Sequence, residues 1–196
     1  MNTPNKLTLA RMIATPIFMA VMLINFDFHY LISLFLFIAA SLTDMIDGKM
    51  ARKYNMVTDF GKFMDPLADK MLTTSAYLGF MFIYGGTQYA WHIVVITFIV
   101  LFREFAVSSI RLVAVTAGGK VVAANMWGKC KTVSQMAGII LALAVYAADE
   151  IFTLPGDFIV IADIAIVVLF WISAILCVIS GVIYIWGGRE YIKNAK

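Results

Sequence analysis

Residues 158–186 read FIVIADIAIVVLFWISAILCVISGVIYIW, a long and almost uninterrupted apolar run. A helix needs about 20 mostly apolar residues to cross the roughly 30 Å hydrocarbon core of a bilayer, so this run can span a membrane and also tilt or protrude. Similar runs precede it at Leu7–Phe26, Tyr30–Ile46, Asp65–Tyr84, Tyr89–Val113 and Thr132–Ala148. The sequence therefore predicts an all-α integral membrane protein with six transmembrane helices.

The composition agrees with this fold class. Of the 196 residues, 62% are hydrophobic and 14% are charged. A soluble domain is about 45–50% apolar and about 25% charged. This comparison excludes a water-soluble enzyme, a nucleic-acid-binding module and a disordered tail. The length fits a single domain over residues 1–196, and the two cysteines, Cys130 and Cys177, are too few for a disulfide framework.

The basic residues predict the orientation of the helices. Six spans place both termini on one side of the membrane, together with the connections after the second and fourth spans. That side and the adjoining helix ends hold all fifteen basic residues: Lys6, Arg11, Lys49, Arg52, Lys53, Lys62, Lys70, Arg103, Arg111, Lys120, Lys129, Lys131, Arg189, Lys193 and Lys196. By the positive-inside rule this side faces the cytoplasm. No small-residue cleavage site follows the first span, so we expect a retained helix rather than a signal peptide.

Acidic residues gather at the cytoplasmic ends of the second and third predicted spans. Asp44 and Asp47 are three residues apart, and Asp65 and Asp69 are four apart. Each pair therefore shares one face of a helix. Proline suits the first turn of a helix, so Pro66 predicts that the third helix begins near Asp65.

Four converging carboxylates favour a metal site. At separations of about 5 Å they would repel one another by a few kcal/mol per pair unless cations lay between them. Ligands that are all oxygen suit a hard divalent ion, Mg²⁺ or Mn²⁺. Gly48 and Gly61 also favour this interpretation, because glycine allows close approach to the backbone. The alternative is a solvated loop in which the acids pair with nearby bases, namely Lys49, Arg52, Lys53 and Lys62.

The stretch from Asp44 to Asp69 resembles the signature of the CDP-alcohol phosphotransferase family. The signature is met without a gap by Asp44, Asp47, Gly48, Ala51, Arg52, Gly61, Asp65 and Asp69. Six predicted spans agree with the family's fold, so the resemblance covers the whole chain. It implies an enzyme in which an alcohol hydroxyl attacks the β-phosphorus of a CDP-linked lipid and CMP leaves. It also implies a homodimer and a polar active-site cavity that opens to the cytoplasm.

The resemblance further implies a role for each signature residue. Two divalent ions would be bound by the four carboxylates, Asp44, Asp47, Asp65 and Asp69. The carboxylate of Asp69 would also accept the proton of the attacking hydroxyl. CDP-diacylglycerol would be bound by Arg52, which grips the diphosphate, and by the residues that line the cytidine pocket, Gly48, Ala51 and Gly61.

The amino-terminal segment carries a second pattern. Asn5, Thr8 and Arg11 recur every three residues and so predict a polar stripe where the first helix meets the cytoplasm. In the family that the chain resembles, this segment helps to hold the CDP group, which assigns Asn5 and Thr8 to CDP-diacylglycerol binding. For Arg11, snorkelling to the membrane surface is an equally good interpretation.

A further group of charged residues suits a phosphorylated acceptor. Arg103 and Glu104 are adjacent within the fourth span, so we expect them to pair with neighbouring polar groups. Arg111, Lys129 and Lys131 are expected to bind an acceptor phosphate, since a neutral alcohol needs no such charge. The charges favour a phosphorylated acceptor, and the stretch Arg103-Glu104-Phe105 resembles that of family members that use sn-glycerol 3-phosphate. The resemblance therefore implies transfer of the phosphatidyl group of CDP-diacylglycerol to sn-glycerol 3-phosphate. The alternative is that these bases only set the topology.

Other functions stay open. Within the family, the acceptor can be a phosphorylated inositol, serine or phosphatidylglycerol, as in phosphatidylinositol phosphate synthase, phosphatidylserine synthase and cardiolipin synthase. A membrane prenyltransferase also binds a lipid diphosphate through paired aspartates, but such proteins are longer and lack the contiguous Asp-Gly and Ala-Arg elements. A small cation-coupled transporter would carry its acids near the bilayer midplane rather than at helix ends.

Overall fold

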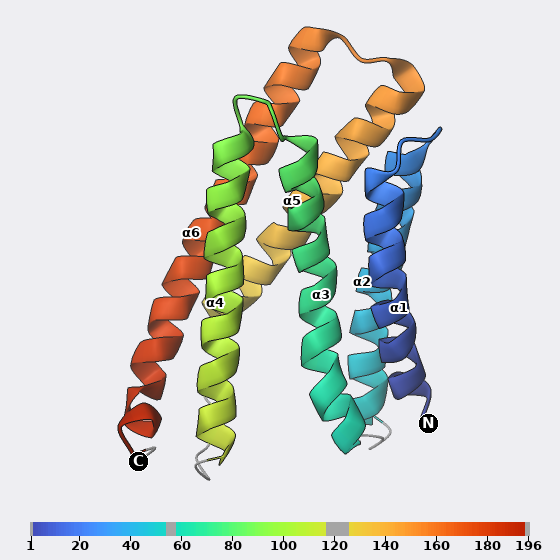
Figure 1. The fold of residues 1–196 in the computed structure, drawn as a ribbon. Coiled ribbons are helices and arrows are strands. Elements are labelled where there is room, and N and C mark those ends of the chain that lie inside the picture. The colour runs from blue at the N-terminus through green and yellow to red at the C-terminus, as the bar shows by residue number, and fades with distance from the viewer. Residues whose placement is uncertain (1, 54–57, 117–125, 195–196) are drawn as a thin grey trace.

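The computed structural model describes residues 2–53, 58–116 and 126–194. These described residues form six helices and no β-strand (Figure 1). The helices are α1 (Thr3–Leu23), α2 (His29–Lys53), α3 (Asp59–Ile83), α4 (Ala90–Thr116), α5 (Met126–Phe152) and α6 (Gly156–Asn194). The predicted all-α fold with six helices is confirmed.

Five of the described helices are long and apolar enough to cross a membrane, namely α1, α2, α4, α5 and α6. The remaining helix, α3, has the same length as α2, 25 residues. Its first half carries two of the four signature acids, Asp65 and Asp69, whereas its second half is apolar and contributes the buried side chains of Leu72, Tyr77 and Phe80 to the core. The chain is therefore a multi-pass membrane protein.

The prediction that the third helix begins near Asp65 is wrong. Helix α3 begins at Asp59, and Pro66 lies inside the helix rather than in its first turn. Thr58 explains the earlier start, because its hydroxyl oxygen accepts a hydrogen bond from the backbone N–H of Gly61 at 3.0 Å and caps the helix. Asp65 is consequently held on a regular helix face, well beyond the cap.

Figure 1 shows α1 and α2 side by side along one edge of the bundle, with α3 next to them and α4 and α6 along the other edge. Helix α5 packs on both α2 and α6 and so joins the two groups. Both termini lie at one end of the bundle, together with the start of α3, and we call this the signature end. The α3–α4 and α5–α6 connections lie at the opposite end, the far end.

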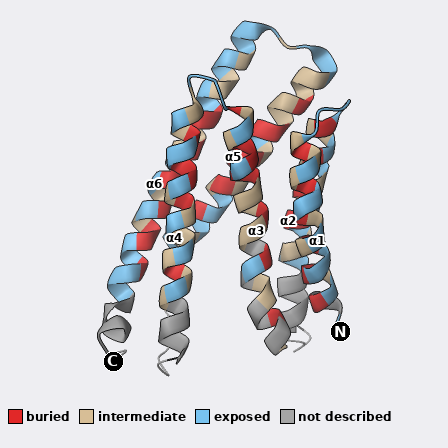
Figure 2. Cartoon of the chain, viewed as in Figure 1, coloured by how far each residue is buried: buried red, intermediate tan, exposed pale blue. Residues whose placement is uncertain are grey.

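The interior is packed through aromatic rings and glycines. The Phe170 ring on α6 contacts Tyr77 and Phe80 on α3, with ring centroids 5.2 and 5.4 Å apart. Gly138 brings α5 close to α6, since a Cβ atom there would lie 2.8 Å from the Phe170 ring. Small residues that let helices approach closely are the usual packing device inside membranes. Buried residues face the inside of the bundle, and exposed ones, many of them large and apolar, face outward as expected for contact with lipid (Figure 2).

Polar side chains join four helices at the far end. The hydroxyls of Tyr84, directly after α3, and of Tyr146 on α5 both donate to Asp163 Oδ1 on α6, at 2.8 and 2.9 Å. Glu150 on α5 pairs with the ring of His29 at the start of α2, with 2.5 Å between Oε1 and Nδ1. These contacts join α2, α3, α5 and α6, and they satisfy a carboxylate in the most apolar helix of the chain.

Candidate active site

The first helix presents a buried polar stripe at the signature end. Asn5, Thr8, Arg11 and Thr15 are all buried although they lie on an otherwise apolar helix. The predicted stripe of Asn5, Thr8 and Arg11 is therefore confirmed. It faces the bundle rather than the membrane surface, which rules out snorkelling as the interpretation of Arg11.

Two acids of the signature meet this stripe. Arg11 Nη1 forms an ion pair and hydrogen bond with Asp44 Oδ1 on α2. The Thr8 hydroxyl donates to Asp65 Oδ1 on α3 at 2.7 Å. Because Thr8 and Arg11 lie about one turn apart on the same face of α1, they draw a carboxylate from each of the two neighbouring helices toward one place.

Asn5 joins α1 to the start of α3 by a hydrogen bond, and Gly61 allows the two helices to approach there. Asn5 Nδ2 donates to the Thr58 hydroxyl oxygen at 2.9 Å, next to the hydrogen bond by which Thr58 caps α3. A Cβ atom on Gly61 would lie 3.0 Å from Asn5 Oδ1 and 3.8 Å from Asp65 Oδ2. Glycine at this position therefore allows the two helices to approach beside the acid.

The donor set here suits a divalent metal ion. Asp44 and Asp65 supply carboxylate oxygens, and Thr8 adds a hydroxyl, all of them hard ligands of the kind that Mg²⁺ and Mn²⁺ prefer. Arg11 already brings one positive charge to Asp44. Among the side chains that the structure describes, no three acids, histidines or cysteines converge. The set of four carboxylates therefore stays a prediction.

Several predicted site residues lie at positions whose side chains are outside the described part of the structure. Their backbones belong to α2, α3 and α4. They are Asp47, Gly48, Ala51, Arg52, Asp69 and Arg111.

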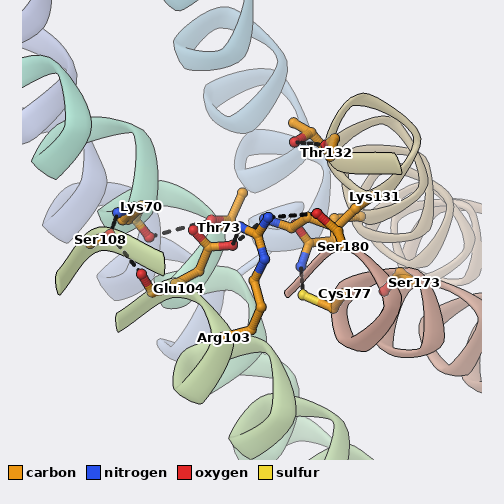
Figure 3. A network of polar contacts seen from close by, with 12 residues as sticks. Lys70, Thr73, Arg103, Glu104, Ser108, Lys131, Thr132, Ser173, Cys177 and Ser180 are labelled. Atoms are coloured by element: carbon orange, nitrogen blue, oxygen red, sulfur yellow. Dashed lines mark hydrogen bonds and ion pairs between the residues drawn. The ribbon is translucent and has the colours of Figure 1, made fainter. Parts of the chain in front are cut away.

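A second polar group lies between α3, α4, α5 and α6 (Figure 3). Glu104 Oε1 on α4 accepts hydrogen bonds from Arg103 Nη1 at 3.1 Å and from Lys131 Nζ on α5. Lys70 Nζ on α3 donates to the Ser108 hydroxyl, which in turn donates to the Glu104 backbone oxygen at 2.6 Å. We call Lys70, Arg103, Glu104 and Lys131 the Glu104 cluster. The predicted pairing of Arg103 and Glu104 with neighbouring polar groups is confirmed.

The residues predicted to bind an acceptor phosphate are placed differently from one another. Lys131 is buried in the Glu104 cluster, whereas Lys129 is exposed. Sequence reasoning missed Lys70 as a member of this cluster. A usable signal was its place one residue after the last signature acid, Asp69, which puts its charge beside the site.

A family model for CDP-alcohol phosphatidyltransferase matches residues 1–186. The chain belongs to this family.

Several curated relatives match this chain over almost its entire length. A protein of Bacillus subtilis (strain 168) is 39% identical over 207 residues, covering 100% of this chain and 99% of its own length. One of Rickettsia bellii is 33% identical and covers 97% of each chain. One of Salmonella typhimurium is 32% identical, covering 100% of this chain and 95% of its own. Each is named CDP-diacylglycerol–glycerol-3-phosphate 3-phosphatidyltransferase.

Members of the CDP-alcohol phosphatidyltransferase family generally use divalent metal ions. The oxygen ligands that Thr8 and Arg11 orient, Asp65 and Asp44, are compatible with this requirement. The four signature acids belong to α2 and α3, whose signature-bearing halves lie at the end of the bundle where both termini lie.

Proposed function

We propose that the protein is a phosphatidylglycerophosphate synthase, an enzyme that transfers the phosphatidyl group of CDP-diacylglycerol to sn-glycerol 3-phosphate and releases CMP. The observation that carries the proposal is the meeting of Asp44 and Asp65 on the polar face of α1. The names of the full-length relatives support the same substrates.

The signature acids would bind the metal ions at the diphosphate of CDP-diacylglycerol. Asp44, Asp47, Asp65 and Asp69 would hold two ions, Mg²⁺ or Mn²⁺. When bound, these ions neutralise the diphosphate and stabilise the departing CMP. Thr8 and Arg11 keep Asp65 and Asp44 turned toward the site through the contacts already described.

The remaining signature residues would bind and orient the donor lipid. Arg52 would grip the diphosphate with its planar guanidinium, which suits two phosphate oxygens at once. The cytidine and its phosphates would be lined by Asn5, Thr8, Gly48, Ala51 and Gly61. The Asp69 carboxylate would take the proton of the acceptor hydroxyl as the oxygen attacks the β-phosphorus, and it must lie within hydrogen-bond reach to do so.

The acceptor phosphate would bind between Arg111, Lys129 and Lys131. The Glu104 cluster supports a phosphorylated acceptor, because Arg103 and Lys131 bring two positive charges to the single carboxylate of Glu104 (Figure 3). A phosphate monoester carries about 1.5 to 2 negative charges at neutral pH. The main alternative is an acceptor of another family member, such as a phosphorylated inositol or phosphatidylglycerol.

The membrane setting follows from the charge distribution. The signature end would face the cytoplasm, with both termini there, in the cytoplasmic membrane. The acyl chains of the donor would stay in the bilayer while glycerol 3-phosphate enters a polar cavity from the cytoplasm. Residues 1–196 would form one domain, and two chains would form a homodimer.

CMP release by the purified protein tests the proposal. CDP-diacylglycerol and Mg²⁺ or Mn²⁺ are supplied with one acceptor at a time: glycerol 3-phosphate, inositol 1-phosphate, serine or phosphatidylglycerol. We expect metal-dependent release with glycerol 3-phosphate. Release with another acceptor alone would keep the chemistry and overturn the acceptor. No release with any of the four, from folded protein, would overturn the enzymatic function.

A further inference from the structure

Glu104 is the point at which contacts from several helices meet, and the signature assigns it no role. Its Oε1 atom accepts hydrogen bonds from two cations, Lys131 on α5 and its neighbour Arg103 on α4. All three side chains are largely buried, with 12% of Glu104, 14% of Arg103 and 8% of Lys131 exposed. Two cations that share one acceptor atom lie close together, and the carboxylate between them offsets their repulsion.

Residues of α6 hold the Arg103 side chain on the side away from Glu104. Arg103 Nη2 donates to the Ser180 hydroxyl on α6 at 2.8 Å (Figure 3). Gly181 makes room for this contact, because a Cβ atom there would lie 3.1 Å from Arg103 Cγ. Arg103 thus contacts α6 and Glu104 at the same time, and these two contacts fix the orientation of its guanidinium.

The Glu104 cluster also has a hydrogen-bond donor that an anion could use. Arg103 Nε is buried and has no hydrogen-bond partner among the residues that the structure describes. Arg103 and Lys131 carry two positive charges, and Glu104 places one negative charge between them. A phosphate group could supply further negative charge, whereas without Glu104 the two cations would repel one another and separate.

We propose that Glu104 is a positioning residue for the phosphorylated acceptor. It holds the Lys131 ammonium and the Arg103 guanidinium together, so that one phosphate group meets both. The inference rests on the proposed function, since it concerns the phosphate of the acceptor in that reaction. Glu104 does not touch the reacting atoms, and it acts through the two cations.

Steady-state CMP release by the full-length Glu104→Gln variant tests this role. Glutamine has nearly the same shape but lacks the charge that holds the two cations. We expect the KM for glycerol 3-phosphate to rise about tenfold or more, while the KM for CDP-diacylglycerol changes less than about twofold. A purely structural role would lower the amount of active enzyme and leave both KM values unchanged. An unchanged or lower KM for glycerol 3-phosphate overturns the inference, and a lower value would mean that Glu104 competes with the phosphate.

Two further variants keep the test decisive. Glu104→Asp retains the charge on a shorter side chain, so its KM for glycerol 3-phosphate should lie between those of the wild type and Glu104→Gln. If Glu104→Gln does not fold, an unchanged acceptor KM in Glu104→Asp overturns the inference, and a selective rise supports it. Glu150→Gln is the matched control, because Glu150 is also an ion-paired glutamate but lies at the far end. Its acceptor KM should equal that of the wild type.

The same assay separates this inference from the proposed function. A wild-type enzyme that releases no CMP with glycerol 3-phosphate refutes the proposed function, and the role of Glu104 with it. A wild-type enzyme that is active, together with an acceptor KM that is the same in Glu104→Gln, refutes the role of Glu104 alone.

Discussion

Arg11 is 2% exposed, and its guanidinium pairs with Asp44 on the next helix. Leaving a buried charge without a partner costs several kcal/mol, so this pair fixes where both side chains lie. Thr8 makes the corresponding contact with Asp65 through a neutral hydroxyl. At the scale of single residues, the two signature acids are therefore oriented by α1 and not by their own helices alone.

The Thr8 contact gives a direct prediction. Thr8→Val keeps the shape of the side chain but removes the hydrogen bond to Asp65 Oδ1. Removing a group that orients a metal-binding side chain typically weakens metal binding about 10–100-fold. We expect the Mg²⁺ or Mn²⁺ concentration for half-maximal CMP release to rise about tenfold, and Thr8→Ser to restore it. A metal titration of the purified variants measures this.

Thr15→Val is the matched control for that titration. Thr15 is as buried as Thr8 on the same helix, but its hydroxyl donates to the Arg11 backbone oxygen at 2.9 Å instead of to an acid. Its metal requirement should equal that of the wild type. Equal requirements in the Thr8 and Thr15 variants would show that Thr8 does not orient Asp65 for metal binding.

Asp69 carries the second prediction at this scale. An amide cannot take the proton of the acceptor hydroxyl, and general-base catalysis contributes about 10²–10⁴ to the rate. Asp69→Asn should therefore lower CMP release by roughly 100-fold or more while largely sparing CDP-diacylglycerol binding. Turnover and lipid-binding measurements on the same preparation check this. Asp27→Asn, an exposed position beyond α1, should keep full activity, and full activity in Asp69→Asn would refute the assignment.

At the scale of helices, two glycines allow close packing against neighbours of different stiffness. A Cβ atom on Gly138 would lie 2.8 Å from the Phe170 ring, which is fully buried and cannot turn away. A Cβ atom on Gly79 would lie 2.6 Å from Met22 Sδ, which belongs to a flexible side chain. Gly138→Ala should lower the free energy of unfolding by about 1–3 kcal/mol, and Gly79→Ala by less. Thermal unfolding in detergent compares the two variants, and equal losses would contradict the argument.

Hydropathy predicted the six helices because a chain inside a bilayer must satisfy its backbone groups within each segment. It did not predict where α3 begins. The first turns of α3 mix charged residues and a glycine with Phe60, Phe63 and Met64, so they lack the long apolar run of a span. Pro66 suggested a later start. The actual start depends on the Thr58 cap, a local hydrogen bond that a hydropathy pattern does not contain.

The candidate site shows a similar division. The three-residue spacing of Asn5, Thr8 and Arg11 predicted one polar face, and the structure has it. The contact of Arg103 with Ser180 joins residues 77 positions apart on different helices. Such partners meet through helix packing, which leaves no spacing in the sequence to recognise.

Across the whole molecule, the bundle separates its polar groups by end. The signature acids lie at the end with both termini, whereas the tyrosines around Asp163 and the pair of His29 with Glu150 lie at the other. Variants of the far end should thus change stability without changing substrate affinity. This separation also makes the orientation in the membrane measurable.

Cys130 reports that orientation. It is exposed near the start of α5, while Cys177 is buried. A membrane-impermeant maleimide should label Cys130 in inside-out vesicles and leave it unlabelled in right-side-out vesicles, because the basic end is expected to face the cytoplasm. Cys130→Ser should abolish the label. Labelling in right-side-out vesicles alone would invert the proposed topology.

The hydroxyls that bind Asp163 set an order for assembly. Asp163 lies in α6, which is synthesised last, and its two donors, Tyr84 and Tyr146, lie in or beside helices made before it. An isolated carboxylate costs about 2.5–3.5 kcal/mol at the bilayer centre on insertion scales, and less toward the interface, where Asp163 lies. The last helix therefore carries a carboxylate whose two hydrogen-bond donors come from parts of the chain that are made earlier, so docking on these helices helps to hold α6 in the bilayer.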